Sequence, residues 1–284
     1  MIKVLSLGAG VQSTTVLLMA LHGEIDMWDY AIFADTGWEP QAVYDNLNWL
    51  DQVVHDHCKL HGAADWWIER VSCGRNIRND EESAIMRGLK SLGQRFITMP
   101  FYTIDQHGKK GMVRRQCTRE YKITPIVKRI RAIAKPPRLR PSPPAPIVEQ
   151  WLGISYDEVT RMRMSKDWWI SNYYPLVEKK MTRYDCLRWM DDHGYPVPPR
   201  SACIACPFKH DDEWRHLRDT SPEEWEDACA FDESIRNNGG GYGQLFVHRS
   251  CVPLRDVDLR TLEDHGQTRM WDNYDGECAG MCGV

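Results

Sequence analysis

The sequence predicts an α/β fold in which a parallel sheet carries helices on both faces. Short apolar runs alternate with helix-like patterns through the first half of the chain, and the first run ends in a loop of small residues. With 284 residues, 42% of them hydrophobic, the chain is long enough to bury a sizeable core. Alternating strands and helices imply parallel strands joined by right-handed crossovers.

The first elements are predicted in the order strand, helix, strand, helix, strand. Each strand is a short apolar run. In the second helix, Val43, Leu47 and Leu50 recur at helical spacing, and Pro40 occupies the first turn, where proline is tolerated. The predicted ranges are 2–7, 13–22, 30–34, 40–60 and 65–71.

The second half of the chain is predicted to contain an insertion and a helical end. Helical spacing predicts a helix over 117–134, whereas the six prolines in 135–146 exclude a helix or an interior strand. "PIVEQWLGIS" then predicts a strand, "YDEVTRMRM" a helix and "WWISNYYPLV" an extended segment. We expect an α/β domain over 1–180, with 135–146 as its insertion, and a helical, cysteine-bearing region over 181–284.

Composition and charge limit the classes of protein. No apolar stretch approaches the roughly 20 residues of a membrane-spanning helix, and the N-terminus has no secretory signal. We therefore expect a cytoplasmic protein without a membrane partner, in which the presence of ten cysteines points to metal or redox chemistry rather than to disulfides. Residues 109–140 hold twelve Lys or Arg and one acid, which predicts either a nucleic-acid surface or a solvated basic helix.

The loop "SLGAGVQSTTV" at 6–16 is the first candidate site. Gly8 and Gly10 would let a phosphate approach the backbone, and Ser13 and Thr14 add hydroxyls at the start of the next helix. The lysine of a Walker loop is missing, as is the third glycine of a dinucleotide fingerprint. Taken alone, the loop also fits a plain strand-to-helix turn.

Four stretches together resemble the PP-loop nucleotide alpha-hydrolase superfamily. These are "SLGAGVQSTT", "FADTGWEP", "QCTREYKITPI" and "GISYDEVTRM", in the family's order and within roughly residues 1–210. The closest likeness is to the phosphoadenosine phosphosulfate reductase-like branch, which also includes enzymes of DNA phosphorothioation. The resemblance implies a Rossmann-like, adenine nucleotide alpha-hydrolase fold that binds ATP or a related adenylyl nucleotide, normally with Mg²⁺.

The resemblance also implies site residues. Two positions depart from the family's S-G-G-x-D-S loop, because Gly8 replaces its serine and the uncharged Gln12 replaces its aspartate. Asp35 and Thr36 would hold the adenosine part, although they also fit a helix cap. Catalytic roles fall to Ser13, Arg161 and Cys278. The full set of expected nucleotide-binding residues is Ser6, Gly8, Gly10, Gln12, Ser13, Thr14, Asp35, Thr36, Gly37, Gly153, Glu158 and Arg161.

Cysteines suggest a metal centre. Cys203 and Cys206 have C-x-x-C spacing, Cys186 lies upstream and Cys117 opens the third stretch. In related adenylyl sulfate reductases such cysteines hold a [4Fe-4S] cluster. The resemblance leaves two arrangements, one with Cys186 as fourth ligand and one with three cysteines and an open iron. Zinc is the main alternative, because tetrahedral thiolate sites suit both.

These features predict an ATP-dependent enzyme that adenylates a nucleic acid or nucleobase for sulfur transfer. The first alternative is a sulfonucleotide reductase, in which Cys278 or Cys282 of "GECAGMCGV" would attack sulfur. The second is a non-catalytic module that binds a nucleotide or a nucleic acid, which the missing aspartate at Gln12 favours. The sequence does not indicate an oligomeric state.

Overall fold

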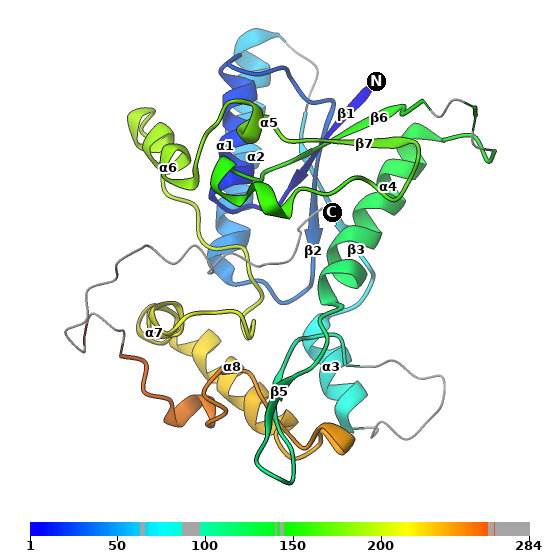
Figure 1. The fold of residues 1–284 in the computed structure, drawn as a ribbon. Helices are drawn as coiled ribbons and strands as arrows, with labels where there is room; N and C mark the ends of the chain where they lie inside the picture. Colours follow the sequence, from blue (N-terminus) through cyan, green and yellow to red (C-terminus); the bar gives the residue numbers. More distant parts are fainter. Residues whose placement is uncertain (63–65, 87–96, 140, 143–144, 261–263, 265–284) are drawn as a thin grey trace.

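A five-stranded parallel sheet forms the centre of the computed structural model (Figure 1). The model describes residues 1–62, 66–86, 97–139, 141–142, 145–260 and 264. The strand order is β3-β2-β1-β6-β7, with every neighbouring pair parallel, which confirms the α/β class. The strands are β1 (Ile2–Leu7), β2 (Tyr30–Asp35), β3 (Ile68–Ser72), β6 (Val148–Leu152) and β7 (Ile170–Tyr173).

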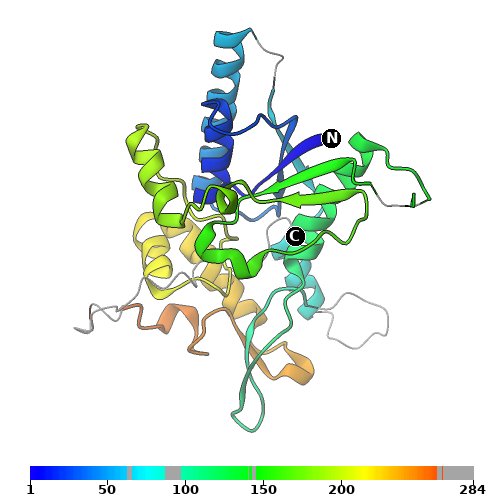
Figure 2. The ribbon, with the colours of Figure 1, turned by 45° about the horizontal axis from the view of Figure 1, so that its top comes forward.

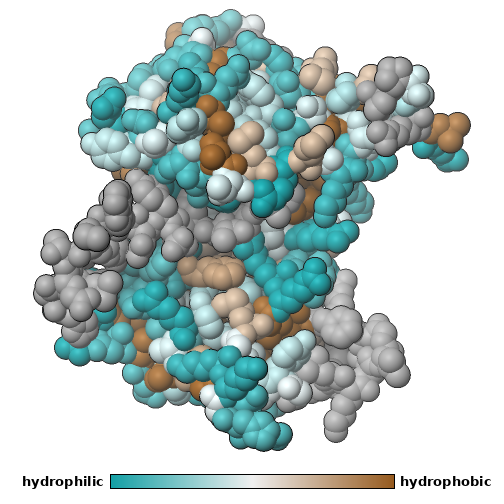
Figure 3. Space-filling model, in the orientation of Figure 1, coloured by the Kyte–Doolittle hydropathy of each residue, from teal (hydrophilic) through white to brown (hydrophobic). Residues whose placement is uncertain are grey.

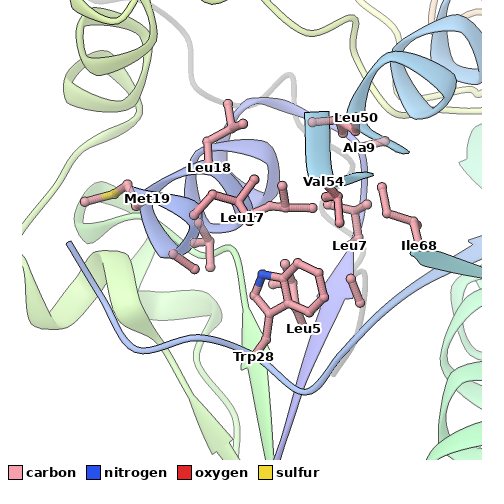
Figure 4. Packing of buried hydrophobic residues seen from close by; sticks show 14 of the residues in the cluster. Leu5, Leu7, Ala9, Leu17, Leu18, Met19, Trp28, Leu50, Val54 and Ile68 are labelled. Carbon is pink, nitrogen blue, oxygen red and sulfur yellow. The ribbon is translucent and has the colours of Figure 1, made fainter. Parts of the chain in front are cut away.

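Helices cover both faces of this sheet. Helices α1 (Val11–Leu21) and α2 (Gln41–His61) lie on one face, and α4 (Thr124–Ala134) lies on the other (Figures 1 and 2). On the first face, Leu17 and Val54 converge over Leu5 (Figure 4). On the second face, Ile126 and Ile130 of α4 pack against Val4 and Ile32. The apolar spacing that predicted these helices is the spacing that buries them.

A second core lies beside the carboxyl edge of the sheet. A three-stranded antiparallel sheet, in the order β5-β4-β8, packs with three helices around buried aromatic residues such as Phe101, Trp214 and Phe231. The strands are β4 (Tyr102–Ile104), β5 (Lys110–Met112) and β8 (Gln244–Phe246), and the helices are α3 (Ile77–Met86), α7 (Asp211–Thr220) and α8 (Pro222–Ile235). Figure 1 shows β1 and β2 pointing toward this part of the molecule.

The two cores do not follow a division of the chain at residue 180. Strand β4 pairs with β8, so residues near 103 share a sheet with residues near 245. Helix α6 (Arg183–Asp192) instead contributes Cys186 and Met190 to the core around α1 and α2, next to the short α5 (Pro175–Glu178). Segments from both sides of the expected boundary at residue 180 therefore pack together in each core.

Several elements differ from their predicted form. Residues 156–161 form a 3₁₀ helix, η2 (Tyr156–Arg161), rather than an α-helix, because the backbone leaves helical geometry at Glu158, with φ −111° and ψ 21°. The predicted helix over 117–134 begins as a π-helix, η1 (Thr118–Ile123), before α4. Two further 3₁₀ helices are η3 (Gly240–Tyr242) and η4 (Leu254–Asp256).

The described residues contain no helix long and apolar enough to cross a membrane. The expected catalytic Cys278 and its neighbour Cys282 lie outside the described residues.

Candidate functional site

The candidate site lies where the order of the parallel strands reverses. From β1 the chain extends the sheet through β2 and β3 on one side and returns to place β6 and β7 on the other. Open α/β sheets bind ligands outside the carboxyl ends of their strands at such a reversal. We call the part of this edge next to the loops after β1, β2 and β6 the crevice. Loops 8–10 and 153–155 border this crevice.

The loop after β1 presents the start of α1 to the crevice. Ala9 has a φ of 58°, which turns the backbone sharply, and Gly10 has the extended conformation of a helix N-cap. Neither a capping side chain nor an acidic first-turn residue occupies the N-terminus of α1. The first helical N–H groups have no intrahelical acceptor, so this end of α1 favours an anion.

Polar side chains hold this loop in shape. The Ser13 hydroxyl accepts from the Gly8 N–H at 3.1 Å and lies 3.3 Å from the Gly10 carbonyl, while Asn46 of α2 donates to the Ala9 carbonyl at 3.2 Å. Ser13 therefore positions the loop, a role different from the catalytic one expected for it. The Asn46 contact was not expected, although a polar residue on the apolar face of α2 was a possible sign of it.

Two other residues that were expected to bind a nucleotide, Ser6 and Thr14, face the protein interior. The Ser6 hydroxyl accepts from Gln150 Nε2 at 2.7 Å, which links neighbouring strands. The Thr14 side chain is completely buried on α1. These two residues support the loop from within the fold.

The segment after β6 is locked onto the start of α1. An ideal Cβ on Gly153 would lie 2.7 Å from the backbone nitrogen of Ser13, so only glycine fits there. Gln12 Nε2 donates to Glu158 Oε2 at 2.8 Å, and Glu158 Oε1 pairs with Arg161 Nη1 at 2.5 Å. Gln12, which replaces the family's aspartate, thus connects α1 to a carboxylate that positions a guanidinium.

The end of β2 supplies another border of the crevice. Asp35 Oδ1 accepts from the Gly37 N–H at 2.7 Å and from the Tyr44 hydroxyl at 2.9 Å. Burial, followed by this hydrogen bond, raises the pKa of Tyr44, so its hydroxyl stays protonated. Gly37 has a φ of 77°, a backbone conformation that suits glycine. The Thr36 hydroxyl donates to Glu39 Oε1 at 3.0 Å.

Three of the four candidate cysteines line one small cavity beside Thr36. Its volume is about 30 Å³, enough for one or two water molecules. Burial raises the pKa of the Cys203 thiol and lowers the pKa of nearby Lys209. Lys122 of the π-helix pairs with the buried Glu39 at 3.2 Å. The cavity-lining residues include Cys117, Cys203, Cys206, Thr36, Lys122 and Arg115.

Cys186 lies elsewhere. Its side chain is buried between α6 and α1 in the core of the parallel sheet, and burial raises its pKa to about 12. It is absent from the residues that line the three-cysteine cavity. Within the described residues, no group of three or more His, Cys, Asp or Glu side chains is arranged to hold a metal ion. Among the described residues, Cys186 therefore does not join Cys117, Cys203 and Cys206 in one centre.

Residues just before the C-x-x-C motif reach the loop after β1. An ideal Cβ on Gly10 would lie 3.8 Å from Ser201 Cβ, which puts residues 200–202 beside the N-terminus of α1. Arg200, next in the chain, pairs with Glu213 and donates to the Phe208 carbonyl at 2.9 Å. Spacing along the chain gave no sign of this approach, because about 190 residues separate Ser201 from Gly10.

The basic segment 109–140 is divided among several elements. Three of its cations pair with acids elsewhere, Lys122 with Glu39, Arg129 with Glu69 and Arg131 with Asp167. Exposed cations of the segment include Lys109, Lys110, Arg114, Arg119, Lys128, Lys135 and Arg138. The segment therefore combines structural ion pairs with cations that face solvent.

The fold is a parallel α/β sheet in which the uncapped N-terminus of α1 lies at the reversal of strand order. Neither a protein-family model nor a curated protein sequence matches the chain. The geometry of the crevice is consequently the basis for a proposal about function.

Proposed function

We propose that this chain binds ATP or a related adenylyl nucleotide at the carboxyl edge of its parallel sheet and uses it to adenylate an acceptor. One observation carries the proposal: loops after β1, β2 and β6 converge where the strand order reverses, with Gly153 pressed against the open N-terminus of α1. This is an adenine nucleotide alpha-hydrolase-like arrangement. Such a crevice suits phosphates because backbone N–H groups and the helix dipole favour negative charge.

Different residues around the crevice contact the phosphates and the adenosine part of the nucleotide. Phosphates lie against loop 8–10 and the first turn of α1, where Gly8 and Gly10 let the backbone approach closely. The adenosine part lies toward Asp35 and Gly37, since the Asp35 carboxylate can accept from a ribose hydroxyl or an amino group. Arg161, already held by Glu158, neutralises charge on the phosphates.

The proposed reaction transfers AMP to an acceptor oxygen. A carbonyl oxygen of a nucleobase attacks the α-phosphorus, the bond to the bridging oxygen breaks, and pyrophosphate leaves. A hydrosulfide-class donor then attacks the activated carbon, and AMP departs with the former carbonyl oxygen. Charge on the leaving pyrophosphate is stabilised by Arg161 and by the N-terminus of α1. Mg²⁺ bound with the triphosphate would supply further charge neutralisation.

The cysteine cavity supports the sulfur-transfer part of the proposal. Cys203 lies 3.4 Å from the Thr36 hydroxyl, so thiols adjoin the nucleotide crevice. Thiolates from Cys117, Cys203 and Cys206 are the donor type that iron–sulfur clusters and zinc prefer. The sulfonucleotide reductase alternative depends on Cys278, outside the described residues.

Nucleotide binding tests the proposal directly. We expect titration calorimetry with a non-hydrolysable α,β-methylene ATP to give saturable one-site binding. Arg161→Ala should weaken it at least tenfold, whereas Arg188→Ala, an exposed arginine on α6, should leave it unchanged. Pyrophosphate release should then appear only when ATP and a nucleic-acid acceptor are both present. Absence of binding by the unaltered protein would refute the proposal.

A further inference from the structure

A cavity outside the nucleotide crevice lies between β7 and the segment that follows η2. Its volume is about 540 Å³, within the range of roughly 300–1,000 Å³ typical of small-ligand pockets. Strand β7 is at the edge of the parallel sheet, so the cavity opens beside an uncovered edge. The lining comes from Pro146, from the segment 162–168 and from residues 170–172 and 174. We call this space the β7 cavity.

The walls of the β7 cavity combine apolar and cationic side chains. Met162, Met164 and the indole of Trp168 form the apolar part, and Met164 is 92% exposed. Arg163 and Lys166, both exposed, add two cations. Figure 3 shows that the surrounding surface, on the face where β7 is seen in Figure 1, is mostly hydrophilic.

The one acidic residue that lines the β7 cavity is already paired. Asp167 Oδ1 accepts from Arg131 Nη2 at 2.9 Å, and the guanidinium of Arg131 lies 4.8 Å from the centre of the Trp169 ring. The remaining charge is therefore positive. An anionic ligand with an apolar, polarisable part matches this lining better than a neutral or cationic one.

The cavity wall is held in place next to the nucleotide crevice. The Tyr174 hydroxyl donates to the Arg163 carbonyl at 2.6 Å and accepts from the Arg163 N–H at 2.9 Å, and Asn172 Nδ2 donates to the same carbonyl at 2.9 Å. Arg161, at the phosphate side, directly precedes Met162, which lines the cavity. Val159, two residues before Arg161 in η2, is also exposed.

We propose that the β7 cavity holds an unpaired base of a single-stranded nucleic acid, and that this strand is the acceptor of the proposed reaction. The base contacts Met162, Met164 and Trp168, while adjoining phosphates contact Arg163 and Lys166. Unstacked bases bind apolar and aromatic side chains irrespective of sequence, and each neutralised phosphate makes binding salt-dependent. This inference rests on the proposed function, which supplies the nucleotide beside the acceptor.

Fluorescence anisotropy with a labelled 12-nucleotide single strand tests this assignment on the full chain. The double variant Met164→Glu/Lys166→Glu should weaken binding at least tenfold at low salt, and its log–log salt slope should be shallower by about 1. The matched control is Lys59→Glu/Leu60→Glu, which makes the same two kinds of change on exposed residues at the end of α2. The control should bind like the unaltered protein.

A second strand of the same length but without any bases distinguishes a base pocket from a purely electrostatic surface. The unaltered protein should bind the strand with intact bases more tightly than the fully abasic strand. The cavity variant should bind the two strands equally. Equal losses in the cavity and control variants, or no preference for bases, would overturn the assignment. Binding of α,β-methylene ATP should be the same in both variants, so a failure of the nucleotide proposal would be seen separately.

Discussion

Replacement of Gly10 by aspartate separates the stability of α1 from its capacity to bind a phosphate. Gly10 already has the extended N-cap conformation, with φ −96° and ψ −179°, and a Cβ there would meet Ser201 only at an ordinary 3.8 Å. Aspartate is a preferred N-cap because its side chain accepts from the free N–H groups of the first turn. The Gly10→Asp variant should therefore fold normally.

The two expected effects have opposite signs. Capping and the helix dipole should raise the free energy of unfolding by about 0.5–1 kcal/mol, since each contributes a few tenths. A carboxylate about 4 Å from a phosphate costs about 4 kcal/mol at an effective dielectric of 20, equivalent to about a thousandfold in affinity. After allowance for screening, we expect nucleotide affinity to fall at least a hundredfold.

Urea denaturation and titration calorimetry with α,β-methylene ATP measure the two quantities on one preparation. Gly10→Asn is the matched control, because asparagine caps the helix without a charge, so its affinity should lie between those of the unaltered protein and Gly10→Asp. A Gly10→Asp protein that is at least as stable and binds nucleotide undiminished would refute the assignment of phosphates to α1.

Three further outcomes follow from the structure. Gly153→Ala should lower the free energy of unfolding in urea by about 1–3 kcal/mol because its Cβ would strike the backbone of α1, whereas Gly241→Ala, whose Cβ meets nothing within 4 Å, should not; equal losses would contradict this packing. Burial raises the pKa of Glu81 to about 7, above the unfolded value of 4.5, so its contribution to stability is full below pH 4.5 and is lost as pH rises to 7. The unfolding free energy of Glu81→Gln should therefore decrease less between pH 4.5 and 7 than that of the unaltered protein, by up to about 3 kcal/mol. An unchanged pH dependence of stability in this variant would contradict a raised pKa of Glu81. If the three-cysteine cavity binds iron–sulfur or zinc, Cys203→Ser should lower the iron, sulfide or zinc content of anaerobically purified protein more than Cys73→Ser does; equal contents would exclude Cys203 as a ligand.

The local pattern of apolar residues was sufficient to predict the parallel sheet and its main helices. Strand β1 has the predicted bounds, and α2 begins within one residue of its predicted start, because short apolar runs and helical apolar spacing reflect burial by near neighbours. The π-helical start of α4 and the 3₁₀ form of η2 were not predictable in this way. Those forms depend on tertiary contacts such as the hydrogen bond from Gln12 to Glu158, which leave no periodic signal in the local sequence.

By itself, the sequence determined the α/β class and the position of the loop at Gly8–Gly10, since these depend on residues close together in the chain. Only the tertiary structure placed Ser201 beside Gly10, moved Cys186 into the core of the parallel sheet and paired Arg131 with Asp167. The physical reason is that such contacts join distant segments, whose meeting is decided by the packing of the whole fold and leaves no periodic signal along the chain.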